Sequence, residues 1–164
     1  MTSISIPDEV TYIKSSAFAN CYSLISIDIP DGVTEIWDSA FNNCYSLTSI
    51  SVPDGVTSIG NYTFSGCSSL TSISIPDGVA FIWNSAFNSW KNLFDILLES
   101  KPILSNTNAF SGTPSTQKIY VPRANISWFE NTTNWVTYCD RFVAIEDNIA
   151  YLESLGYNVD KYKN

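Results

Sequence analysis

Cysteine and aspartate recur at a constant spacing along this chain of 164 residues. Thiolates at a fixed spacing are suited to disulfides or metal binding, and regularly spaced carboxylates to calcium binding or paired acid–base chemistry. Members of each column are separated by about 23 residues, a period within the range of internal repeats. The two columns are Cys21, Cys44 and Cys67, and Asp8, Asp31, Asp54 and Asp77. Which chemistry applies depends on the elements that hold these side chains.

We interpret the repeating cysteines as structural residues. Stacked parallel strands would hold consecutive cysteines about 5 Å apart, which a disulfide tolerates, but parallel side chains are wrongly aimed for an S–S bond. Cysteine is often buried as a small apolar residue, and Trp90 and Thr113 occupy the same position in later repeats. We therefore expect the three cysteines to be buried, reduced and unbonded. Cys139 lies outside the register, with no sign of a nucleophile's partner nearby.

The aspartates favour a turn over a metal site. Three of the four precede glycine, so each carboxylate is suited to accept hydrogen bonds from its own turn. Calcium needs six to eight oxygen ligands, whereas the neighbouring columns offer valine and threonine. Glycosidase chemistry needs two carboxyls across a cleft. We expect no metal ion and no cofactor.

Composition narrows the function further. The chain has no histidine. This excludes catalytic nucleophiles that depend on histidine, imidazole metal ligands and imidazole pH switches, so an enzyme is the least favoured class of protein. A net charge of −8 argues against nucleic acid as a partner. No apolar stretch approaches the roughly 20 residues of a membrane span, so we expect no membrane insertion. The start, MTSISIPDEV, lacks the pattern of a secretory signal, which would have to lie upstream.

The same spacing extends to whole units of sequence. Aligned units read LISIDIPDGVTEIWDSAFNNCYS, LTSISVPDGVTSIGNYTFSGCSS and LTSISIPDGVAFIWNSAFNSWKN, with an incomplete unit before them and a decayed unit from Leu93. A period of roughly 20–29 residues with a recurring L-x-x-I-x-I core is typical of leucine-rich repeats, with one strand and one return segment per coil. We predict a repeat solenoid, a right-handed leucine-rich-repeat coil with parallel β-strands.

Alternation within each unit places the strands. In one unit Ile50 and Val52 point to one side, while Ser49 and Ser51 point to the other. Proline and Asp-Gly then end each strand, and the Ala-Phe or Thr-Phe step before the cysteine fills the far side of the coil as a short turn or 3₁₀ segment. The predicted strands lie near residues 3–6, 26–29, 49–52, 72–75, 95–98 and 118–121.

A known family shares these motifs. The pattern I-P-D-G-V-T-x-I-x-x-x-A-F-x-x-C-x-x-L resembles the BspA-like (Treponema-type) leucine-rich repeats of bacterial and protozoan cell-surface proteins. SKPILSNTNAF (100–110) and KIYVPRANISWFENTTNW (118–135) resemble the C-terminal end of such arrays. The resemblance covers residues 1 to about 147 and implies adhesion or protein binding, with a secreted or cell-surface location.

We divide the chain into three parts. Residues 1–122 are the repeat array, and residues 123–147 are a C-terminal cap in which large aromatics cover the open end of the core. Val143 and Ile145 alternate like a short edge strand. Residues 148–164 are a short helix that Gly156 ends, followed by a polar tail expected to fray. The aromatics of the cap are Trp128, Phe129 and Trp135.

Two exposed surfaces are candidate binding sites. On the outward side of the strands, early coils present mostly serine, whereas later coils gain size and charge, as a protein-binding patch would. That patch comprises Asp28, Phe94, Asp95, Leu97, Lys118 and Tyr120. On the return path, tryptophans directly follow an inward isoleucine and should point outward. The alternative aromatic site comprises Tyr22, Trp37, Tyr45 and Trp83.

The leading hypothesis is a non-catalytic, adhesin-like module that binds a host or neighbouring-cell protein. A carbohydrate-binding module that uses the exposed aromatics is one alternative, and a structural spacer is another. The first strand, expected to start at Thr2 or Ser3, has no covering segment before it, so Ile4 and Ile6 lie at a bare end. We therefore expect either a longer array or self-association through this N-terminal edge.

Overall fold

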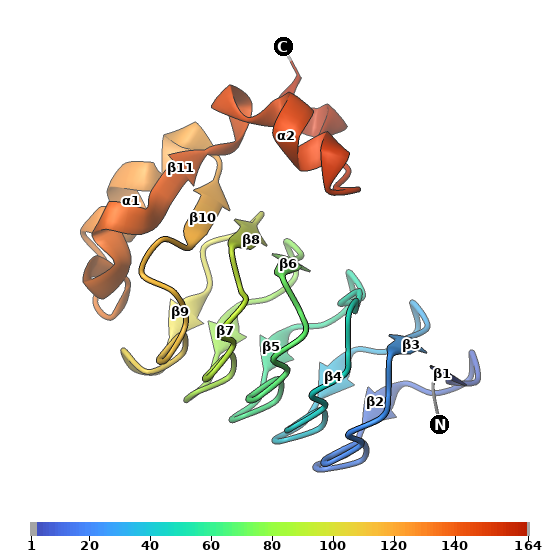
Figure 1. The fold of residues 1–164 in the computed structure, drawn as a ribbon. Helices are drawn as coiled ribbons and strands as arrows, with labels where there is room; N and C mark the ends of the chain where they lie inside the picture. Colours follow the sequence, from blue (N-terminus) through green and yellow to red (C-terminus); the bar gives the residue numbers. More distant parts are fainter. Residues whose placement is uncertain (1–2, 164) are drawn as a thin grey trace.

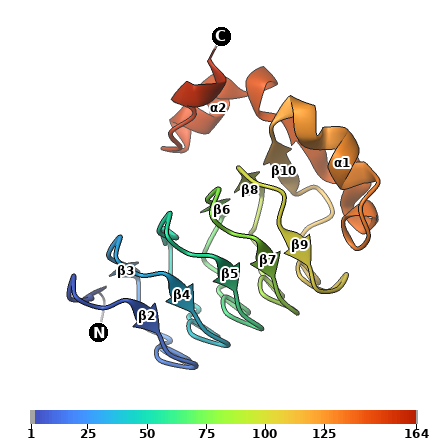
Figure 2. The same cartoon turned by 180° about the vertical axis from the view of Figure 1, so that it is seen from behind.

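Two rows of parallel strands run along a solenoid of stacked coils in the computed structural model, which describes residues 3–163 (Figures 1 and 2). We call the outward side of the first row the strand face. The row consists of β1 (Ser3–Ser5) paired with β3 (Ser26–Asp28), and of a sheet in the order β11-β10-β8-β6. The strands of that sheet are β6 (Ser72–Ile75), β8 (Asp95–Leu98), β10 (Lys118–Val121) and β11 (Phe142–Ala144).

Register in the first row follows the sequence repeat. Ile4 is opposite Ile27, and Ile73 is opposite Ile96, so each pair is separated by one repeat. The predicted parallel solenoid is confirmed. The strand predicted at 49–52 is wrong, because only Ser49 forms a bridge there, to Ser26, although Val52 still points into the core.

The return path forms a second sheet, which the sequence had not predicted as strands. Its order is β2-β4-β5-β7-β9, and each strand contributes one buried side chain and one outward one. The buried positions hold isoleucine or leucine, so this side of each coil is anchored by the same kind of packing as the first. The strands are β2 (Tyr12–Ile13), β4 (Glu35–Ile36), β5 (Ser58–Ile59), β7 (Phe81–Ile82) and β9 (Ile103–Leu104).

Turns close the far side of each coil, as predicted. Backbone bonds join successive coils there: the N–H of Phe41 donates to the Thr63 carbonyl at 2.9 Å, and that of Phe64 to the Ala86 carbonyl at 2.9 Å. Each turn also uses left-handed backbone, with φ of 59° at Asn43 and 77° at Gly66. Asparagine and glycine accept this conformation at low cost, which explains their recurrence in this column.

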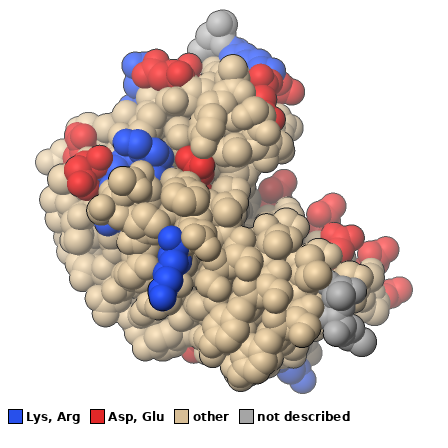
Figure 3. Space-filling view, in the orientation of Figure 1, with Lys and Arg blue, Asp and Glu red and all other residues tan. Residues whose placement is uncertain are grey.

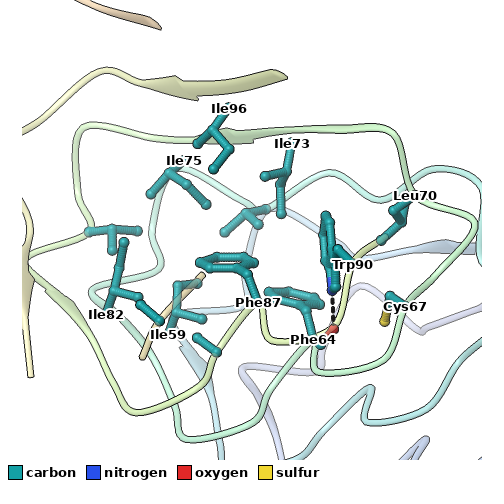
Figure 4. Packing of buried hydrophobic residues seen from close by; sticks show 14 of the residues in the cluster. Ile59, Phe64, Cys67, Leu70, Ile73, Ile75, Ile82, Phe87, Trp90 and Ile96 are labelled. Carbon is teal, nitrogen blue, oxygen red and sulfur yellow. Dashed lines mark hydrogen bonds between the residues drawn. The ribbon is translucent and has the colours of Figure 1, made fainter. Parts of the chain in front are cut away.

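A ladder of phenylalanines fills the core beneath these turns (Figure 4). Neighbouring rings stack with centroids 5.2 to 5.8 Å apart and nearly parallel. Each stacked pair contributes about 0.5–1.5 kcal/mol beyond the burial of its area. The rings belong to Phe18, Phe41, Phe64, Phe87 and Phe110.

The cysteine column packs beside this ladder and donates hydrogen bonds. The Cys44 thiol donates to the Phe18 carbonyl at 3.1 Å, and the Cys67 thiol donates to the Phe41 carbonyl at 3.3 Å. Trp90, in the same column, donates its indole N–H to the Phe64 carbonyl (Figure 4). The column therefore selects a donor that fits the core, which explains how tryptophan replaces cysteine. None of the four cysteines forms a disulfide bond. Cys44 and Cys67 are buried, as expected, but Cys21, in the first coil, is only half-buried.

The C-terminal cap closes the far end of the phenylalanine ladder. Trp135 and Tyr138 contact Phe110, and the Trp135 indole N–H donates to the Pro102 carbonyl at 2.7 Å. Phe129 is fully buried against Trp135, whereas Trp128 is half-buried. The cap consists of 3₁₀ helix η1 (Arg123–Asn125), α1 (Ile126–Glu130) and 3₁₀ helix η2 (Trp135–Arg141).

The chain then adds one more strand in register. The predicted short edge strand is β11, which contains Val143 but ends before Ile145, where η3 begins. Its Phe142 pairs in parallel with Ile119 of β10, again one repeat away in sequence. The rest of the chain folds over the strand face, where α2 arches above the array (Figure 1). It consists of η3 (Ile145–Asp147), α2 (Ile149–Ser154) and η4 (Asp160–Tyr162). Gly156, with φ of 86°, follows the predicted helix.

Candidate recognition surface

The C-terminal segment, by which we mean residues 145–163, covers three of the six residues of the predicted strand-face patch. Asp95, Leu97 and Tyr120 do point outward from their strands, but their exposed fractions are only 5%, 1% and 4%. The expectation that they form an exposed patch is wrong. Asp28, Phe94 and Lys118 remain exposed, and Asp28 lies on β3, outside the sheet that holds β8 and β10.

Apolar packing explains this cover. Leu97 and Tyr120 form a second hydrophobic cluster with Ile145, Leu152 and Val159. The size of the outward residues on β8 and β10, which the sequence suggested as a partner site, instead serves contacts within the chain. Burial, together with the neighbouring Asp95 carboxylate, raises the pKa of Tyr120.

The tail is also held by charge. Lys161 Nζ lies 2.9 Å from Asp77 Oδ2 and 2.7 Å from Glu99 Oε2. Desolvation by itself would lower the pKa of Lys161, but the hydrogen bonds to these carboxylates outweigh it, so the pKa is raised. The expectation of a frayed tail is wrong for the described residues, because Val159 is buried and Lys161 is anchored to two coils.

The aspartate column lies on the rim of the array. Figure 3 shows acidic side chains spaced along one edge of the coils. The turn itself is closed by backbone hydrogen bonds, such as Val33 N–H to the Pro30 carbonyl at 3.0 Å. The carboxylates thus do not perform the turn-closing role that we expected, and Asp77 pairs with Lys161 instead. Within residues 3–163 no group of three or more histidine, cysteine, aspartate or glutamate side chains is arranged to hold a metal ion.

The four aromatics of the alternative site belong to two separate places. Tyr22 and Tyr45 are exposed and stack on each other, with ring centroids 5.2 Å apart and an interplanar angle of 7°. They follow the cysteine column. Trp37 and Trp83 directly follow strands of the second sheet and line a different groove. The structure therefore does not gather the four residues into one site.

The second sheet presents an aromatic face, which sequence reasoning recognised only at its two tryptophans. Trp37 and Trp83 are 43% and 44% exposed, as predicted for outward side chains. Three further large apolar residues, which point outward from the strands themselves, are exposed to similar degrees. The sequence did contain a sign of these residues: in each coil they lie two positions before the column that holds the tryptophans. We define the aromatic face as Tyr12, Trp37, Phe81, Trp83 and Ile103.

A notch interrupts this face at its middle coil. There the outward positions hold only Ser58 and Gly60, while the coils on either side carry Trp37 and Trp83. The resulting groove has a volume of about 350 Å³ and is bordered by both tryptophans. We call this groove the notch.

A polar ladder lies along the edge of the notch. Asn61 donates its backbone N–H to Asp38 Oδ1 at 2.8 Å and its side-chain amide to Asp38 Oδ2 at 3.1 Å. Asn61 Oδ1 accepts the backbone N–H of Asn84 at 3.2 Å. These bonds fix the carboxylate and the amide beside the groove, and each retains further lone pairs or hydrogens for a ligand.

Gly60 is required by this arrangement. A Cβ at position 60 would lie 2.7 Å from Asp38 Oδ1 and 2.9 Å from the Asp38 backbone nitrogen. A side chain there would displace the Asp38 carboxylate, so the open floor of the notch and the position of Asp38 depend on the same glycine.

The first coil leaves the N-terminal end of the core open. A cavity of about 590 Å³ at this end is lined by Ile6, Val10 and Phe18, among others. These side chains are only half-buried, whereas Val33 and Phe41, at the equivalent positions of Val10 and Phe18 in the next coil, are fully buried.

The Cys44 thiol is not an activated nucleophile. Burial raises the pKa of the Cys44 thiol to about 11, which keeps it protonated and unreactive near neutral pH. Among the described residues, no helix is both long and apolar enough to cross a membrane. The exposed aromatic face and its notch are the candidate contact surface.

Comparison with known proteins agrees with this architecture. The family model of the BspA type leucine rich repeat region matches residues 1–117 and 69–154, in six copies. No match was found among curated proteins.

Three solved structures resemble the chain. A leucine-rich repeat protein of T. pallidum has 25% identity and a TM-score of 0.67, over 87% of this chain and 67% of that protein. A leucine-rich cell-surface protein of Faecalibacterium prausnitzii has 28% identity and a TM-score of 0.58, over 88% of this chain and 31% of its own length. A leucine-rich repeat protein of Bacteroides ovatus has 31% identity and a TM-score of 0.54, over 74% and 40%. The repeats, their register and these matches together show that the chain belongs to the BspA-type leucine-rich repeat family.

Proposed function

We propose that this chain is a non-catalytic, adhesin-like recognition module of a secreted or cell-surface protein, and that it binds a protein on a host or neighbouring cell through the aromatic face. The observation that carries the proposal is the exposure of five large apolar side chains on four of the five coils of one sheet. Exposed apolar patches rimmed by polar residues mark interaction sites in soluble proteins.

Two further facts support the proposal. Family members are binding modules without catalytic activity as a rule, and one structural relative is described as a cell-surface protein. The strand face is a weaker candidate, because the C-terminal segment already covers Leu97 and Tyr120.

The test is binding of the purified chain to a panel of purified extracellular-matrix proteins, measured by biolayer interferometry. Trp37→Ala and Phe81→Ala should each weaken any binding by about tenfold or more, as truncation of a central aromatic does. Phe94→Ala is the matched control. It removes a similarly exposed aromatic that directly precedes β8, away from the aromatic face, and should leave binding unchanged. Loss of binding in the control alone would place the contact on the strand face and refute the proposal.

A further inference from the structure

We propose that the notch between Trp37 and Trp83 is a binding site for one pyranose ring of a neutral glycan. The inference names a ligand class for part of the aromatic face, and it rests on the proposed function only in assuming that this face meets another molecule. Four features carry it: the spacing of the tryptophans, their fixed orientation, the polar edge and the charge.

Spacing limits the notch to one ring. β4, β5 and β7 are consecutive neighbours in the second sheet, so the backbones that carry Trp37 and Trp83 are about 9.5 Å apart. Each stacking contact with an aromatic ring occupies about 3.5–4 Å. This separation leaves room for one saturated six-membered ring beside the two indoles that border the groove, and not for two.

The aromatic walls are already held in place. The Trp37 ring stacks on Tyr12 with centroids 5.7 Å apart, and its indole N–H donates to Glu35 Oε2 at 2.6 Å. The Trp83 ring stacks on Phe81, with centroids 6.1 Å apart. A ligand would therefore meet indoles that need little reordering, which lowers the entropic cost of binding.

The polar edge suits a ligand rich in hydroxyl groups. Asp38 and Asn61, together with Ser58, offer both acceptors and donors beside the indoles. A pyranose has apolar C–H faces for the rings and hydroxyls at its rim for these groups. A proline or leucine side chain would cover the same rings, but it would desolvate the Asp38 carboxylate without adding a hydrogen bond to the lone pairs that Asn61 leaves free, which is costly.

Charge favours a neutral sugar. Asp38 and Glu35 lie at or beside the notch, and the chain carries a net charge of −8, so an acidic sugar or a phosphate would be repelled. An arginine side chain of a partner protein is the main competitor, since guanidinium groups stack on indoles and pair with carboxylates. Both Asp38 oxygens already accept N–H groups of Asn61, which reduces the gain from a further cation.

The experiment is saturation-transfer difference NMR of the full chain with methyl β-glucoside, methyl β-galactoside and methyl α-mannoside. N-acetylneuraminic acid and N-acetylarginine amide serve as the acidic and cationic probes. We expect transfer to the ring C–H protons of at least one neutral glycoside, with an affinity of about 1 mM for a single ring.

Three variants test the geometry. Trp37→Ala removes one wall and should weaken binding of the glycoside about tenfold. Ser58→Tyr fills the notch and should abolish binding; its fold should persist, because Tyr12 and Phe81 occupy the same column in other coils. Tyr45→Ala, the matched control, removes an equally exposed aromatic elsewhere and should not change binding.

The outcomes separate this inference from the proposed function. If no neutral glycoside binds, or if only N-acetylarginine amide binds and is displaced by salt, the glycan site is refuted, whatever the matrix-protein binding shows. If a glycoside binds equally well to Ser58→Tyr, the site lies elsewhere and the inference also fails. If glycoside binding follows the variants while no matrix protein binds, the glycan site stands and the protein-binding proposal falls.

Discussion

The Tyr151 hydroxyl donates a hydrogen bond of 2.8 Å to Asp95 Oδ2, across 56 residues of sequence. This bond ties α2 to the outward side of β8, at the point where the Asp95 carboxylate is buried. The same bond raises the pKa of Tyr151, with burial adding to the shift. The C-terminal segment is thus an integral part of the fold, because the array itself places a charged acceptor beneath it.

Tyr151→Phe should lower the free energy of unfolding by about 1.5–3 kcal/mol, because a hydrogen bond to a buried charged acceptor is lost while the ring remains. Urea denaturation followed by circular dichroism measures the change. Tyr45→Phe removes a hydroxyl from an equally exposed ring and serves as the control. Equal stability of the two variants would show that the bond contributes nothing.

Lys161→Ala should loosen the tail without unfolding the array. The Lys161 side chain is 46% exposed, so its pairs with Asp77 and Glu99 contribute about 1 kcal/mol at most. Hydrogen–deuterium exchange should increase at residues 157–163 and remain unchanged in the strands. Lys163→Ala breaks pairs only with Glu153 and Asp160, both within the C-terminal segment, and should have a smaller effect on Tyr157 to Val159. Faster exchange throughout the coils would contradict this account.

Features that recur in every coil could be predicted from the sequence. Residues at equivalent positions of successive repeats occupy the same environment, so each repeat supports the same interpretation. Isoleucine columns predicted the parallel strands, and the outward position of Trp37 and Trp83 followed from their place after an inward isoleucine. The cover over Leu97 and Tyr120 could not be read in this way. It depends on contacts between residues 145–163 and coils far away in sequence, and no column records such a contact.

The candidate site was only partly predictable for a related reason. Outward side chains of the second sheet look like ordinary loop residues until the return path is known to be extended. Only then do Tyr12, Phe81 and Ile103 join the tryptophans on one face. The notch arises because a single coil has no large side chain at the outward positions of the second sheet, and Gly60 by itself is typical of a turn.

Cys44→Ala should destabilise the chain by about 1–2 kcal/mol near neutral pH, through lost packing volume and the lost bond to the Phe18 carbonyl. The difference should shrink at alkaline pH and reverse its sign by about pH 11. Burial, with a smaller contribution from Cys21, raises the Cys44 pKa from 9.0 to about 11, so below pH 9 the thiol is protonated in both states. Between pH 9 and 11 only the unfolded state releases the proton, and stability falls by up to about 1.4 kcal/mol per pH unit.

Urea denaturation in the presence of reductant, at intervals between pH 7 and about 11, measures this convergence of wild type and Cys44→Ala. Cys139→Ala is the control, because Cys139 is exposed and its removal should cost little packing. A constant difference between wild type and Cys44→Ala across the range would refute the assignment of the titrating group.

The open N-terminal end predicts self-association of the isolated 164-residue chain. Within residues 3–163, β1 pairs with β3 alone, so one edge of β1 has unpaired backbone groups beside the half-buried Ile4 and Ile6. Such an edge is a template for another chain. We expect concentration-dependent association in sedimentation equilibrium.

Ile4→Lys should weaken this association by more than about tenfold, equivalent to about 1.4 kcal/mol, because a lysine at the contact must lose its hydration. The later coils should keep their circular dichroism and denaturation midpoint, since repeats interact mainly with their neighbours. Ser5→Lys places the same charge on the adjacent, outward position of β1 and controls for the change in net charge. A monomer at all concentrations, or an equal effect of the two lysines, would show that the apolar end of the core is not the contact.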